Sequence, residues 1–153
     1  MGKRLHVVKR QREYGSTEAF NWCFDKFLKL LDVLGCNICQ DDESSDFWEL
    51  TKDEYNRSIA ILKIIRESDV TMDGNYSKQK EEIDQIYNSD DYQKLFVENE
   101  ESYCGITAED VDLYDVINSL KDLDIDLDEL LDIMNSFLNE SDKKSAWIQF
   151  EAW

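Results

Sequence analysis

The apolar residues alternate at the two ends of this chain and recur every three or four positions in between, and this change of period is the strongest constraint on its fold. Residues 4–11 carry Leu5 and Val7 on one face and predict a strand that ends at Gly15. Residues 146–153 also alternate and predict a second strand. We therefore expect a small sheet that pairs the two ends of the chain.

The middle of the chain has the spacing of amphipathic helices, and it contains no proline to break them. A polar loop is expected at residues 36–46, a short strand at 46–50 and a second loop at 68–77. Gly35 is expected to end the first helix. The expected helix starts are Ser16 or Thr17, Thr51 with Glu54, Thr107 with Asp110, and Asp126 with Glu129. Two shorter helices are expected between them, one that contains Ile83, Ile86 and Tyr87 and one that contains Tyr92, Leu95 and Phe96.

These patterns predict one fold class and one domain. Strands at both ends with helices between them indicate an α+β fold, mostly helical, with a small sheet that pairs the N- and C-terminal strands. A chain of 153 residues is large enough to bury one core without disulfides. No repeat and no linker divides it, so residues 1–153 are expected to form a single acidic α+β domain.

The charge of the chain is large, negative and uneven. It has 35 acidic and 17 basic side chains, and its net charge is −18. Residues 1–40 have a net charge of +3, whereas residues 41–153 have −21. Between Glu98 and Asp132 there are thirteen acidic side chains and one basic side chain, Lys121. Such an excess repels phosphate, which excludes direct binding of nucleic acid.

Two interpretations of this acidic stretch remain open. Some of its acids fall in the first turns of expected helices, where the helix dipole favours them. The others repel their neighbours on the same helix, so local stability does not explain them. They serve either solubility or the docking of a basic partner. If that partner normally holds DNA or RNA, carboxylates spaced like phosphates would compete for its lysines and arginines.

The predicted docking residues are acids of this stretch together with two tryptophans that share one face of the terminal strand. Amphipathic aromatic residues beside charge are typical interface anchors. The predicted partner-binding residues are Glu109, Asp112, Asp115, Asp122, Asp124, Asp128, Asp132, Trp147 and Trp153.

Three motifs have spacings similar to those of metal or redox sites, but none is predicted to bind a metal or cofactor. Cys36 and Cys39 form a C-x-x-C, but they follow an expected helix end and precede acids, which disfavours a thiolate. Residues 69–77 resemble a calcium loop, yet the twelfth position is Lys80 and not glutamate. The alternating acids of residues 122–128 are interpreted as a polar turn.

The sequence contains no G-x-S-x-G, no phosphate-binding P-loop, no G-x-G-x-x-G and no H-E-x-x-H motif, and the single histidine, His6, has no nucleophile pattern near it in sequence. The protein is therefore predicted not to be an enzyme. It has no apolar run long enough for a membrane span and no signal peptide, which predicts a cytoplasmic protein with reduced cysteines and no membrane contact.

The predicted function is that of a non-enzymatic acidic inhibitor. It would bind the basic surface of a nucleic-acid-handling protein such as a nuclease, as anti-CRISPR or anti-restriction proteins do. One alternative is an immunity protein or antitoxin that neutralises a cationic nuclease toxin. The other is a protein that depends on a divalent metal, held by the aspartates of residues 69–77 or 122–128.

Overall fold

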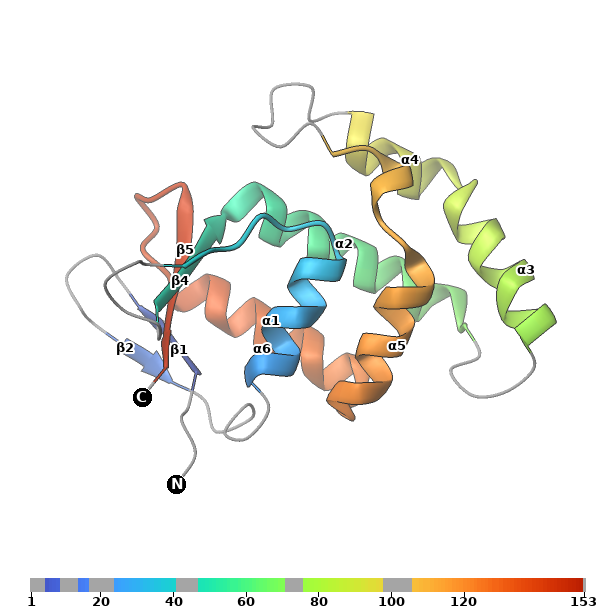
Figure 1. The fold of residues 1–153 in the computed structure, drawn as a ribbon. Helices are drawn as coiled ribbons and strands as arrows, with labels where there is room; N and C mark the ends of the chain where they lie inside the picture. Colours follow the sequence, from blue (N-terminus) through green and yellow to red (C-terminus); the bar gives the residue numbers. More distant parts are fainter. Residues whose placement is uncertain are drawn as a thin grey trace.

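The computed structural model describes residues 5–8, 14–16, 24–40, 47–70, 76–97 and 106–152. The fold is α+β, as predicted (Figure 1). The helices are α1 (Phe24–Val33), α2 (Lys52–Ser68), α3 (Tyr76–Tyr87), α4 (Asp90–Val97), α5 (Leu113–Leu123) and α6 (Leu127–Glu140), with a one-turn 3-10 helix, η1 (Ala108–Asp110). The strands are β1 (Leu5–Val8), β2 (Tyr14–Ser16), β3 (Cys39–Gln40), β4 (Phe47–Thr51) and β5 (Trp147–Ala152).

The sheet has five antiparallel strands in the order β2-β1-β5-β4-β3. The predicted pairing of the two terminal strands is confirmed, because Val7 of β1 lies opposite Phe150 of β5. The sheet is not limited to the termini, since β4 and β3 extend it on the other side of β5. β5 is therefore the central strand.

The predicted strand end at Gly15 is wrong. Gly15 lies inside β2, opposite Val7 of β1, because a glycine can occupy a strand interior as well as a turn. Ser16 also belongs to β2 and does not cap α1, which begins at Phe24. The alternative cap, Thr17, lies outside the described residues.

The helices cover one face of the sheet (Figure 1). The core at that face is an aromatic cluster around Phe150, whose ring centroid is 5.4 Å from that of Phe137, 6.1 Å from Phe27 and 6.2 Å from Tyr55. The Tyr55 hydroxyl donates a hydrogen bond to the Met134 carbonyl at 2.8 Å. These contacts join β5 to α1, α2 and α6.

Local capping signals were correct at two helix ends. Gly35 has a φ of +92° and follows α1, as predicted. Its N–H donates to the Asp32 carbonyl at 3.0 Å, and the next N–H, of Cys36, donates to Leu31 at 3.1 Å. This is the hydrogen-bond pattern of a Schellman cap. At the start of α2, the Thr51 hydroxyl accepts from the Glu54 N–H at 3.2 Å.

Two other predicted helix starts are corrected. Thr107 and Asp110 form a capping box, but it caps only η1, because Val111 is extended and interrupts the helix. α5 begins after Asp112, whose carboxylate accepts from the Tyr114 N–H at 2.9 Å. Asp126 is the N-cap of α6 as predicted, yet its side chain makes no capping hydrogen bond.

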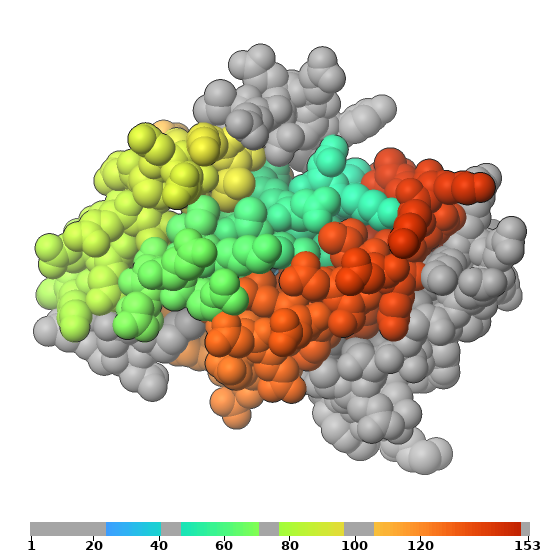
Figure 2. All heavy atoms as spheres, turned by 180° about the vertical axis from the view of Figure 1, so that it is seen from behind, coloured from blue at the N-terminus to red at the C-terminus, as the bar shows by residue number. Residues whose placement is uncertain are grey.

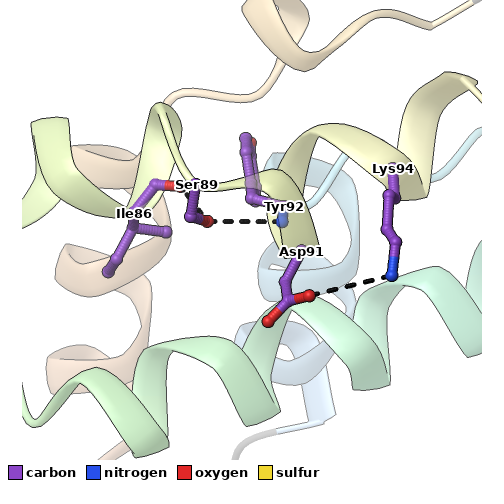
Figure 3. Close-up of polar contacts among 5 residues, drawn as sticks. All are labelled: Ile86, Ser89, Asp91, Tyr92 and Lys94. Carbon is purple, nitrogen blue, oxygen red and sulfur yellow. Dashed lines mark hydrogen bonds and ion pairs between the residues drawn. The ribbon is translucent and has the colours of Figure 1, made fainter.

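A short turn joins α3 to α4, and both helices lie beside α2 (Figure 2). The Ser89 hydroxyl donates to the Ile86 carbonyl at 2.7 Å and accepts from the Tyr92 N–H at 3.3 Å (Figure 3). Tyr92 is thereby held in the core, while Asp91 and Lys94 form an exposed pair at 3.8 Å. Within the described ranges, no helix has the length and apolar character that a membrane crossing requires.

Candidate acidic binding surface

The predicted acids fall into two rows, one on η1 and α5 and one on α6. In the first row, Asp115 and Asp122 are exposed and seven residues apart, which places them on the same side of α5. Glu109 is exposed on η1. Asp112 belongs to this row, but its carboxylate has a structural role as the N-cap of α5.

The second row lies on α6, a helix of 14 residues without a basic side chain. Asp128 and Asp132 are exposed and one turn apart. The Asp128 carboxylate accepts from Arg66 of α2 at 3.0 Å, and the two side chains are 68% and 43% exposed. Such an exposed ion pair stabilises a fold by about 0–1 kcal/mol, so it neutralises Asp128 only in part.

The two rows do not form one flat patch. α5 packs against α1, as Figure 1 shows, whereas α6 packs against α2 on the side that Figure 2 shows. The rows meet at the turn of residues 124–126 between the two helices. A partner that touches both rows must therefore contact this turn.

Lysines of α1 approach the end of the first row. The Lys26 ammonium donates to the backbone carbonyl of Asp122 at 3.0 Å. Lys26, Lys29 and Asp122 also line a hollow of about 200 Å³ between α1 and α5. These two lysines are far from the acidic stretch in sequence, so a local count of charges does not reveal them, although their spacing of three places both on one side of α1.

A larger hollow of about 550 Å³ lies where the two rows meet, and we call it the α2–α5–α6 hollow. Its apolar side chains are Ile65, Val70, Leu120, Ile125 and Leu127. Its acidic side chains are Asp69, Asp124 and Asp126. Among these, only Asp124 belongs to the predicted binding residues.

Asp69 and Asp124 occupy equivalent places at two helix ends. Each follows its helix, α2 or α5, in the left-handed conformation, with φ of 51° and 52°. Aspartate adopts this conformation more readily than most residues, so the backbone itself does not require glycine. This similarity comes from backbone geometry, and the sequence gives no signal that brings the two aspartates together.

Trp147 lies away from the turn of residues 124–126, where the two acidic rows meet. Trp147 is 40% exposed at the start of β5, beyond the carboxyl end of α6. A helix of 14 residues is about 21 Å long, so Trp147 lies far from the acids at the other end of α6. Its exposed neighbours in sequence are Lys143 and Lys144. Trp153 lies outside the described residues.

The two described cysteines differ in environment. Cys36 is buried, and its sulfur lies 3.0 Å from the Ser58 hydroxyl. Burial raises the pKa of the Cys36 thiol to about 12, which suppresses the reactive thiolate. Cys39 is exposed in β3. In the part of the chain that the structure describes, no three histidine, cysteine or acidic side chains are grouped to hold a metal ion.

The calcium-like segment is only partly described. Asp69 and Val70 are described, but residues 71–75 lie outside the described ranges.

A comparison with protein-family models, curated proteins and solved structures found no match to this chain.

Proposed function

We propose that the protein is a non-enzymatic, acidic interaction protein of the cytoplasm that inhibits a nucleic-acid-handling protein by occupying its basic surface. Anti-CRISPR and anti-restriction proteins are examples of this class. The protein would act as a nucleic-acid mimic, because its carboxylates would contact the lysines and arginines that otherwise bind phosphates.

The observation that carries the proposal is the lack of matching cations on α6. This helix exposes Asp128, Glu129 and Asp132, and among the described residues only Arg66 forms an ion pair with it, through Asp128. Asp128 and Glu129 lie in the first turn of α6, where the helix dipole favours them, but Asp132 lies one turn further on and repels Asp128. A basic partner would remove that repulsion on binding.

Electrostatic attraction of this kind acts mainly on the rate of association. A charged surface steers an oppositely charged partner, and salt screens the effect over about 8–10 Å at physiological ionic strength. We therefore expect the association rate to fall as salt rises, with a smaller change in the dissociation rate.

The test is capture of partners by the protein and by a variant with three reversed charges, Glu109→Lys, Asp115→Lys and Asp132→Lys. These side chains are exposed and form no hydrogen bond or ion pair with a described residue, so the fold should survive. Asp112 is left unchanged because it caps α5. The matched control reverses the same number of exposed charges elsewhere, as Glu67→Lys, Glu81→Lys and Asp84→Lys.

We expect the first variant to fail to capture a nuclease or other nucleic-acid-binding protein that the control variant still captures. Equal capture by the protein and both variants would contradict the proposal and leave the acids with a role in solubility alone. Capture of only neutral or acidic proteins would contradict it as well.

A further inference from the structure

We propose that the α2–α5–α6 hollow binds an arginine side chain on a short basic segment of the partner. The guanidinium would lie among Asp69, Asp124 and Asp126, and the aliphatic stem would lie on the apolar wall. This inference rests on the proposed function, since it identifies the anchoring point where the two acidic rows meet.

The size and wall of the hollow suit such a side chain. A volume of about 550 Å³ lies within the range of sites that hold small ligands, and so it has room for an arginine and part of its neighbours. Leu120, Ile125 and Leu127 are among the apolar side chains of the wall. Arginine buries its methylene groups on such a surface while its charged end stays beside polar groups.

The charge of the hollow favours a cation. Its three carboxylates are exposed and have no hydrogen-bond or ion-pair partner among the described residues, and the Asp126 carboxylate is not used for capping. The lining also contains two cations, Lys121 and Arg66, of which Arg66 is shared with Asp128 in the exposed ion pair at 3.0 Å, so the three carboxylates outnumber the cations. The carboxyl ends of α2 and α5 add partial negative charge.

Arginine fits this combination better than lysine. A guanidinium is more weakly hydrated than an ammonium, so it loses less hydration free energy when it contacts the apolar wall. It also has five N–H donors in a plane, which allows it to bind more than one carboxylate at once.

The test is an NMR titration of the whole protein with the peptide acetyl-Gly-Arg-Gly-amide. The matched control peptide replaces arginine with citrulline, which has nearly the same shape but no charge. We expect saturable shifts of the Leu120 and Ile125 methyl signals with the arginine peptide, and affinity lower by at least about tenfold with citrulline. Absence of these shifts, or equal affinity for both peptides, would overturn the inference.

A variant tests the carboxylates directly. Asp69→Asn, Asp124→Asn and Asp126→Asn remove the charges but keep residues that tolerate the left-handed conformation and the N-cap position. We expect this variant to keep its fold and to bind the arginine peptide with an affinity at least about tenfold lower. The control Asp115→Asn with Asp132→Asn should bind the peptide normally. Equal binding by both variants would overturn the inference.

The two proposals can fail separately. If charge reversal abolishes partner capture but the peptide does not bind the hollow, the function stands and the anchoring point is wrong. If the peptide binds but reversal leaves capture unchanged, the hollow is a guanidinium site and the proposed function is wrong.

Discussion

Replacing Phe150 with alanine tests whether the aromatic cluster is the centre of the fold. Phe150 is fully buried on the central strand and contacts rings from three helices, those of Phe27, Tyr55 and Phe137. The change removes a whole ring and leaves a cavity among side chains that belong to different elements. Because these elements are held by many other contacts, the cavity is expected to close only in part.

The expected loss follows from this geometry. Phenylalanine-to-alanine changes in a core destabilise by about 3–5 kcal/mol, and edge-to-face ring pairs add about 0.5–1.5 kcal/mol beyond area burial. We expect Phe150→Ala to lose about 4 kcal/mol of unfolding free energy. For a chain of this length, that corresponds to a melting temperature lower by roughly 8–16 °C.

Urea denaturation followed by circular dichroism measures the loss. The matched control is Gln149→Ala, the adjacent position on the opposite face of β5, whose side chain donates a hydrogen bond to Glu49 at 3.0 Å. We expect the control to lose about 0.5–1 kcal/mol. A loss below about 2 kcal/mol for Phe150→Ala, or equal losses for the two variants, would refute the reasoning.

Three further changes test local features. Asp112→Ala should lose about 1 kcal/mol because it removes the N-cap of α5, whereas Asp126→Ala should change the unfolding free energy by less than about 0.5 kcal/mol. Urea denaturation compares them, and equal losses would argue against the assigned caps. Cys36 should be alkylated by iodoacetamide at least about 100-fold more slowly than Cys39 at mildly alkaline pH, because its raised pKa leaves little thiolate. Peptide mapping by mass spectrometry measures both rates, and similar rates would disprove the buried environment. Tyr55→Phe should lose about 1 kcal/mol because it removes the buried hydrogen bond from the tyrosine hydroxyl to the Met134 carbonyl. An unchanged melting temperature would show that this hydrogen bond contributes nothing net.

Periodicity was sufficient to predict the core and the main elements. The alternation of residues 146–153 agrees with the burial of Ile148 and Phe150 on one face of β5. The helical spacing of the middle of the chain agrees with the burial of Tyr55, Ile59 and Leu62 of α2. These predictions succeed because a buried face repeats with the period of its own element and requires no knowledge of the neighbours.

Residues that mark turns and helix caps, and the distribution of charge, predict less of the structure than periodicity does. Gly15 lies within a strand, and Thr107 caps a single turn, because a local signal does not reveal whether the element continues beyond it. The arrangement of the acids depends on which helices pack together. Lys26 reaches Asp122 across 96 positions of sequence, a contact that no local pattern contains.

The central position of β5 has a consequence for the order in which the sheet can assemble. β1 and β4 are not neighbours, and each pairs with a different side of β5. During synthesis both strands leave the ribosome long before the strand that separates them. The two hairpins, β1–β2 and β3–β4, have no partner in common until residues 147–152 emerge. A nascent chain stalled before this point would expose the unpaired edges of β1 and β4 at once.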